Sequence, residues 1–276
     1  MKMSKTRILT ECAMMIALAT GLSLVKLIEM PYGGSVTAAS MLPIVLLAYR
    51  HGTKYGLLSG LVYGVLQQLL GLNTLSYATS WVSVVAIILL DYVIAFAVIG
   101  LAGLVRRAPM RQGLALGVGA ALASVLRYLC HVVSGATVWA GLSIPDEAAM
   151  LYSLSYNATY MLPETIILAC AAVYVGSLID FRSIGLRPIV AHAATSEERR
   201  TSVIYAVCGL LCTVCTGVIT VLLFPHLQGE SGAFDFSGIT GAPWVPILVC
   251  LGVLLLAAAT VFVLYMRKSV KARGTV

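Results

Sequence analysis

The stretch RYLCHVVSGATVW places an arginine, a histidine and a tryptophan in a segment that is otherwise apolar. Arg127, His131, Gly135 and Trp139 recur every four residues, so on a helix they form one slowly drifting stripe. His131 and Trp139 lie about 12 Å apart along such a helix, at 1.5 Å per residue. The glycine between them leaves room for a flat molecule against the helix backbone. The stripe therefore predicts one wall of a binding pocket.

A carboxylate lies deep in another apolar segment. Asp91 is flanked by WVSVVAIILL on one side and YVIAFAVIGL on the other. An ionisable group at bilayer depth costs a few kcal/mol, so it normally faces a bundle interior or a cavity. We expect Asp91 to neutralise an organic cation, and a structural pairing with Arg127 is the alternative.

Aromatic and amide side chains accompany these charges. Tyr152, Tyr156 and Tyr160 form a second stripe on helical spacing, and Asn157 lies beside it. The rest of the set is Trp81, Tyr92 and Trp139. Aromatic faces bind cations, and Asn and Tyr hydrogen-bond to ring heteroatoms, so the set fits a small, flat, positively charged heteroaromatic molecule. Taken singly, these aromatic residues also fit an interfacial belt, and His131 also fits a bond to a neighbouring helix.

Patterns of catalysis are missing from the sequence. It holds no HExxH, no glycine-rich phosphate loop, no GxSxG and no cytoplasmic acidic cluster for Mg²⁺. The seven cysteines all fall in apolar segments, where thiols behave as small buried hydrophobes. The pair Cys212 and Cys215 forms a CxxC, which we interpret as helix packing; a redox or metal role is the alternative. We therefore expect neither an enzyme, nor a metal, nor a resident cofactor.

The composition predicts an integral membrane protein. Of the 276 residues, 60% are hydrophobic and 11% are charged, with a mean hydropathy of +0.97. Soluble domains have roughly 25% charged residues. The net charge of +7 comes from basic clusters between apolar runs, so it indicates membrane topology and not a nucleic-acid partner.

The apolar runs predict about eight membrane spans. They cover residues 8–28, 36–50, 53–71, 79–104, 113–141, 149–179, 203–224 and 243–266. Every second connection is basic, which puts both termini in the cytoplasm. Two basic residues escape the pattern: Lys26, which can snorkel or pair with Glu29, and Arg127, which we expect to brace the pocket through Asp91 or Glu164.

The longest charged connection divides the chain. We expect a six-span module at residues 1–180, a cytoplasmic linker at 181–200 and a two-span extension at 201–276. The spans of the extension carry no charge, which argues against a second transport path.

Four segments resemble the ThiT family, the thiamine-specific S-components of energy-coupling factor transporters. They are GGSVTAASMLPIVLLAYRHG, LLDYVIAFAVIGLAGL, RYLCHVVSGATVW and YSLSYNATYMLPE, in the family's order, within about residues 8–180. The resemblance implies an all-α integral membrane fold, a six-helix bundle that binds thiamine near the outer face, here followed by two further transmembrane helices. It implies substrate contacts from Asp91, Tyr92, His131, Gly135, Trp139, Tyr152 and Asn157. Where some members place a tryptophan in the first outer loop, this sequence has Gly33 and Gly34.

The resemblance also implies partners. S-components dock on a membrane-embedded T-component through small residues of the first span, and two cytoplasmic ATPases supply energy from ATP. Ala13 and Ala17 give the small-xxx-small spacing that lets helices approach closely, although ordinary packing within the chain also explains it. The expected location is the cell membrane of a prokaryote, surrounded by lipid.

Other functions remain open from the sequence. A related vitamin or a pyrimidine precursor fits the same residues. A proton-coupled secondary transporter that uses Asp91 or His131 is the main alternative, and a purely structural membrane protein is a third.

Overall fold

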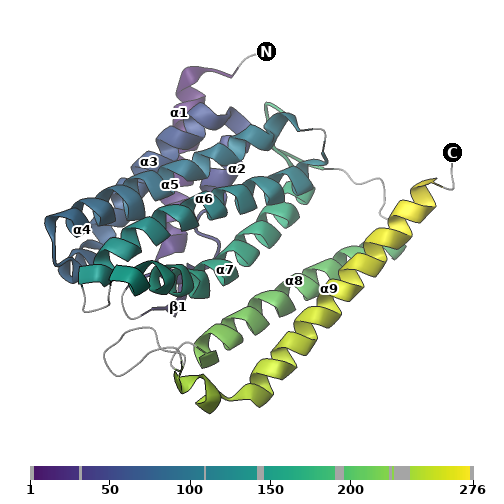
Figure 1. Ribbon diagram of the computed structural model, residues 1–276. Coiled ribbons are helices and arrows are strands. Elements are labelled where there is room, and N and C mark those ends of the chain that lie inside the picture. Colours follow the sequence, from purple (N-terminus) through teal and green to yellow (C-terminus); the bar gives the residue numbers. More distant parts are fainter. Residues whose placement is uncertain are drawn as a thin grey trace. The chain divides into compact units, whose positions relative to one another are not determined.

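The computed structural model describes residues 3–30, 33–108, 110–141, 146–189, 196–223, 226 and 237–273. The chain divides into two units, one made mainly of residues 1–189 and one made mainly of residues 190–276. The units are described separately below (Figure 1).

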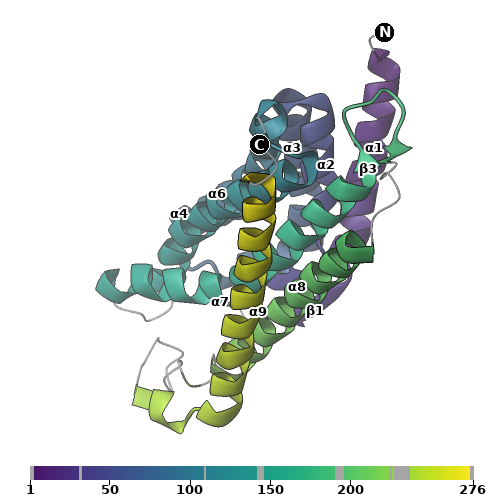
Figure 2. The same ribbon diagram turned by 90° about the vertical axis from the view of Figure 1, so that its right-hand side faces the viewer.

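The first unit is a bundle of helices. Its α-helices are α1 (Lys5–Ser23), α2 (Leu42–His51), α3 (Thr53–Leu70), α4 (Trp81–Ala86), α5 (Ala95–Ala97), α6 (Gln112–Gly141) and α7 (Asp146–Leu178). The π-helix η2 (Ile87–Ile94) joins α4 to α5, and 3-10 helices occur at η1 (Leu72–Tyr77) and η3 (Val98–Arg107). The long helices α6 and α7 pack side by side, as both views show (Figure 1 and Figure 2).

Four helices of the described residues are long and apolar enough to cross a membrane. They are Trp81–Arg107, Gln112–Val138, Ala148–Leu178 and Trp244–Val261. Each coincides with a predicted span. The larger number of eight spans stays a prediction.

The second predicted span is only partly helical. Its helix α2 begins at Leu42, with Pro43 in the first turn, where the missing N–H of proline leaves no backbone bond unmade. Its ten residues are about 15 Å long, half the thickness of a bilayer core. Every residue from Pro43 to Arg50 is buried. The helix therefore lies in the centre of the bundle, where it packs against α1, α3, α6 and η3.

The predicted span at residues 79–104 is not a regular helix. It runs through α4, the π-helix η2, α5 and η3. Gly56, Gly60 and Gly64 of α3 face this segment so closely that a Cβ on Gly64 would lie 2.5 Å from the carbonyl oxygen of Tyr92. The π-helix contains Asp91 and Tyr92. Such segments occur frequently at functional sites, because they re-aim side chains within a helix.

We expected a purely helical fold, but two connections between helices contain short strands. The loop after α1 forms a hairpin, in which β1 (Lys26–Glu29) pairs antiparallel with β2 (Ser35–Thr37). The short pair β3 (Ile179–Asp180) and β4 (Arg187–Pro188) follows α7. The fold is thus mostly helical. Apolar periodicity did not predict a hairpin here, because it is held by backbone pairing and by a glycine turn.

Lys26 pairs with Glu29, as one of the two sequence interpretations expected. The Nζ–Oε1 distance is 2.5 Å. Both side chains are well exposed, so the pair adds little stability.

At the end of the bundle opposite the Lys26–Glu29 pair, a buried arginine links several segments. The buried Arg50 donates from Nε to Glu11 Oε2 at 2.7 Å, and its other nitrogens donate to the carbonyl oxygens of Ser183 and Ile184, both at 2.9 Å. The Nε2 atom of His51 lies 2.7 Å from the same Glu11 oxygen. This cluster joins α1, α2 and the segment after α7.

We predict that Arg50→Gln lowers the melting temperature of the purified protein in detergent. Removing one partner of a buried ion pair costs about 3–5 kcal/mol. The matched control is Arg107→Gln, which changes an exposed arginine and is expected to melt like the wild type. Equal melting temperatures for both variants would contradict the prediction.

The second unit contains two long helices, α8 (Ser196–Leu223) and α9 (Trp244–Arg273), and the 3-10 helix η5 (Ser237–Gly241). The two long helices pack against each other. Cys208, Cys215, Ile247 and Ala257 are among the buried side chains of this unit. Cys215 is a free thiol within this helix pair, an arrangement in keeping with a packing role for the CxxC.

Candidate functional site

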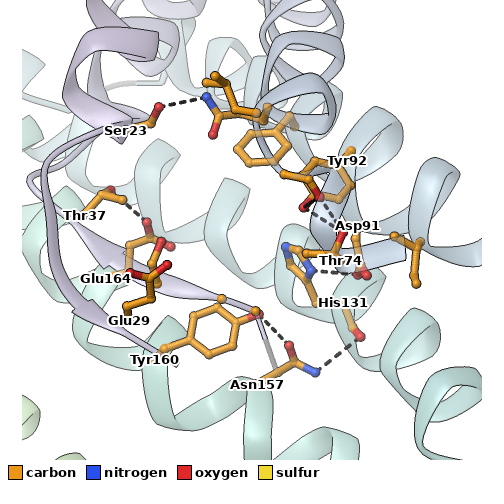
Figure 3. Close-up of a pocket in the computed structure, with 18 of the residues that line it drawn as sticks. Ser23, Glu29, Thr37, Thr74, Asp91, Tyr92, His131, Asn157, Tyr160 and Glu164 are labelled. Atoms are coloured by element: carbon orange, nitrogen blue, oxygen red, sulfur yellow. Dashed lines mark hydrogen bonds and ion pairs between the residues drawn. The ribbon is translucent and has the colours of Figure 1, made fainter. Parts of the chain in front are cut away.

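A cavity of about 300 Å³ lies within the first unit. Its walls come from the β1–β2 hairpin, α3, η1, η2, α6 and α7 (Figure 3). Its size is at the lower end of the range for small-molecule sites. Six of the substrate-binding residues predicted from the sequence line it: Asp91, Tyr92, His131, Gly135, Tyr156 and Asn157.

Asp91 and His131 form a pair on one wall. Asp91 Oδ1 lies 2.8 Å from His131 Nδ1, and Asp91 Oδ2 accepts a hydrogen bond from Ser134 at 2.9 Å. The aspartate comes from the π-helix, and the other two residues come from adjacent turns of α6. The sequence alternative that paired Asp91 with Arg127 is not what the structure shows.

Asn157 and Tyr160 of α7 line the neighbouring wall of the cavity and hydrogen-bond to each other. The Tyr160 hydroxyl donates to Asn157 Oδ1 at 2.6 Å, while Asn157 Nδ2 donates to the His131 carbonyl oxygen at 3.3 Å. Gly135 lies where α6 approaches α7, and a Cβ there would collide with the Ser153 hydroxyl. The glycine is therefore needed for helix packing as well as for space in the cavity.

The hairpin closes one side of the cavity through its turn. The Tyr156 hydroxyl donates to the Gly33 carbonyl oxygen at 2.7 Å. Gly34 has a φ of +88°, and a Cβ on it would lie 2.7 Å from the Tyr160 ring. The hairpin turn is thus fitted closely against two tyrosines of α7.

A second carboxylate lies on the opposite wall from Asp91, beside Thr37 (Figure 3). Glu164 pairs with Arg127 Nη1 at 2.6 Å and accepts from Thr37 at 3.0 Å. The Arg127 guanidinium also lies 4.7 Å from the centre of the Phe96 ring. As expected, Arg127 braces the cavity wall, and its partner is Glu164. The Arg127–Glu164 and Lys26–Glu29 pairs are each neutral overall, so Asp91 is the remaining acidic side chain among the described lining residues.

Two predicted substrate-binding residues, Tyr152 and Trp81, do not line the cavity. Tyr152 is buried and stacks on Tyr156, with ring centres 6.1 Å apart, so it supports a lining residue. Trp81 is 78% exposed, because the first turn of α4 points it outward. Trp139 belongs to α6, but its side chain lies outside the described residues.

Sequence reasoning missed several polar lining residues. They are Ser23, Thr37, Ser40, Gln67, Asn73 and Thr74. Gln67 donates to Ser23 at 2.9 Å, and Thr74 lies 3.2 Å from the Tyr92 hydroxyl. The sequence could have indicated Gln67 as a lining residue, because its amide lies within an otherwise apolar span.

Comparison with known proteins decides which family these residues belong to. Residues 9–184 match the family described as thiamine transporter protein, Thia_YuaJ. The chain belongs to this family. It is similar to the thiamine transporter ThiT of Bacillus subtilis (strain 168), with 39% identity over 176 residues, 60% of this chain and 86% of the relative. This thiamine transporter family member is a multi-pass membrane protein and not an enzyme.

A solved structure shares the fold of this transporter. ThiT from Listeria monocytogenes superposes with a TM-score of 0.50 at 24% identity, covering 62% of this chain and 93% of that chain. The family match ends at residue 184, so α8 and α9 lie beyond it.

Proposed function

We propose that this transporter is the substrate-binding S-component of an energy-coupling factor importer and captures thiamine from the outer face. The observation that carries the proposal is the cavity that brings together Asp91, Tyr92, His131 and Asn157. Membership of the thiamine transporter family indicates thiamine as the solute, and the cavity is the site where we expect it to bind.

The chemistry of the cavity suits thiamine. Thiamine joins a permanently charged thiazolium ring to a neutral aminopyrimidine ring. With Arg127 paired to Glu164, the Asp91 carboxylate gives the cavity the negative charge that a monocation needs. Tyr92, Tyr156 and Tyr160 offer aromatic surface near that charge.

The membrane arrangement is part of the same proposal. Eight spans, with both termini in the cytoplasm, place the hairpin and the cavity at the outer face. This arrangement includes a six-span module at residues 1–180, a linker at 181–200 and a two-span extension at 201–276. The protein resides in the bacterial cell membrane.

The docking surface for a T-component is the exposed side of α1. Ala13 and Ala17 are exposed there, and a Cβ on Gly21, one turn further, would meet nothing within 4 Å. Small residues let helix backbones approach closely in a membrane. Two ATPase subunits on the cytoplasmic side complete the importer.

The proposal predicts that the purified full-length protein binds thiamine and that Asp91→Ala weakens binding about 30-fold or more. Loss of one partner in a buried, hydrogen-bonded charge pair costs about 2–5 kcal/mol. Isothermal titration calorimetry measures both affinities. The control is Asp180→Asn, which changes an aspartate of β3 outside the cavity.

A second experiment tests the energy source. We expect vesicles that contain this protein alone to show no concentrative thiamine uptake. Uptake by such vesicles that an uncoupler abolishes would contradict the S-component proposal and support a proton-coupled transporter.

A further inference from the structure

The second unit carries a row of cysteines on the side of α8 that meets α9. Cys208, Cys212 and Cys215 follow one another at spacings of four and three residues, which places them along one side of the helix. Cys208 and Cys215 are buried, and α9 is the helix of this unit that packs against α8. All three are free thiols.

A fourth free cysteine, Cys250, lies on the matching side of α9. It comes three residues after Ile247 and seven residues before Ala257, and both of these neighbours are buried. The thiols of Cys215 and Cys250 are hydrogen-bonded to each other across the helix pair. The structure therefore brings together two thiols that are 35 positions apart in the sequence, since 250 − 215 = 35.

The two thiols lie inside apolar parts of their helices. Cys215 comes eight residues before the last residue of α8, and Cys250 comes six residues after the first residue of α9. At 1.5 Å per residue these separations are about 12 and 9 Å, so the two depths agree.

The surroundings of the pair favour a reagent that dissolves in lipid. Residues 203–224 and 244–266 contain no charged side chain, and the neighbours of Cys250, Val249 and Leu251, are exposed apolar residues. A charged oxidant from water would have to give up its hydration to reach the thiols, which is costly. An uncharged, lipid-soluble oxidant does not have that cost.

We propose that Cys215 and Cys250 are a redox-active pair, which a lipid-soluble quinone oxidises to a disulfide between α8 and α9. The oxidation breaks both S–H bonds and forms one S–S bond. The two protons and two electrons pass to the quinone, which becomes a hydroquinone. Hydrogen-bonded thiols need only a short movement to reach the S–S bond length of about 2.05 Å. In bacteria, membrane quinones accept the electrons that disulfide formation releases.

This pair differs from the CxxC motif of the sequence. A bond between Cys212 and Cys215 would join two turns of one helix, whereas a bond between Cys215 and Cys250 joins two helices and closes the loop of residues 216–249. The oxidised form therefore holds α8 and α9 in one packing. The pair lies beyond residue 184, where the family match ends, so the inference goes beyond the proposed thiamine uptake and does not depend on it.

The test uses the purified full-length protein in liposomes, with decylubiquinone as the oxidant. This quinone is fully substituted, so a thiol cannot add to its ring. Remaining thiols are blocked with N-ethylmaleimide, and mass spectrometry of the peptides identifies any disulfide. We expect a disulfide between Cys215 and Cys250, with one hydroquinone formed for each disulfide, measured by its absorbance. The neutral reductant dithiothreitol should reverse the reaction.

Single substitutions identify the two partners. Cys215→Ser and Cys250→Ser should each lose the bond between α8 and α9 and the matching yield of hydroquinone. The controls Cys212→Ser, on the same helix, and Cys170→Ser, an exposed cysteine of α7, should react like the wild type. Circular dichroism checks that each variant is folded. If the wild type forms a different disulfide, or if Cys215 and Cys250 both stay free after oxidation, the inference is overturned.

Discussion

Glu164→Gln is expected to lower the melting temperature of the protein by roughly 6–20 °C. Glu164 and Arg127 are 2% and 7% exposed, and their charged atoms lie 2.6 Å apart within the bundle. Neutralising the glutamate leaves a buried guanidinium without its counter-charge, which costs about 3–5 kcal/mol, and each kcal/mol shifts melting by about 2–4 °C at this size. Thermal unfolding in detergent measures the shift.

Two further variants separate charge from packing. Glu29→Gln breaks the exposed pair with Lys26 and should change the melting temperature little. The double variant Arg127→Met/Glu164→Leu removes both buried charges and is expected to recover much of the lost stability, since apolar groups replace a buried ion pair well. If Glu164→Gln melts like the wild type, the pair does not hold this wall of the cavity.

Gly34→Ala is expected to weaken thiamine binding about 10- to 100-fold. The residue has a φ of +88°, and its Cβ would lie 2.7 Å from the Tyr160 ring. Backbone strain of this kind costs about 1–3 kcal/mol, and 1.4 kcal/mol corresponds to a tenfold change in affinity. The hairpin turn would have to move away from α7, which breaks the hydrogen bond from Tyr156 to the Gly33 carbonyl oxygen.

Gly185→Ala provides the matched control for this experiment. Gly185 lies outside the cavity, has no atoms within 4 Å of a Cβ position and has no positive φ. Calorimetry should give it the affinity of the wild type. Wild-type affinity in Gly34→Ala would show that a displaced hairpin turn does not affect the site.

The helices were the part of the fold that the sequence predicted well. Apolar runs of about 20 residues at 149–179 and 243–266 correspond to α7 (Asp146–Leu178) and α9 (Trp244–Arg273). A helix in a membrane satisfies its own backbone, so length and hydropathy are enough to predict it. The hairpin after α1 depends on pairing between two strands and on a glycine turn, which hydropathy does not encode.

The sequence singled out the charged side chains of the candidate site but did not show how they pair. Asp91, Arg127, His131 and Glu164 stand out because ionisable groups are costly at membrane depth. The pairing of these four groups depends on the rotation of α6 about its axis relative to α7 and to the π-helix. Trp81 shows the same limit, since an aromatic residue near a membrane surface gives no sign of the direction in which it points.

The sequence by itself determined that the chain is a membrane protein of the thiamine transporter family and that a few polar residues must gather inside it, because composition and local spacing carry that information. The tertiary structure alone decided that Asp91 turns toward His131 while Glu164 takes Arg127, and that the turn of the hairpin fits against Tyr156 and Tyr160. Those contacts join residues up to 126 positions apart, between Gly34 and Tyr160. Their geometry depends on the register between packed helices, which no single segment specifies.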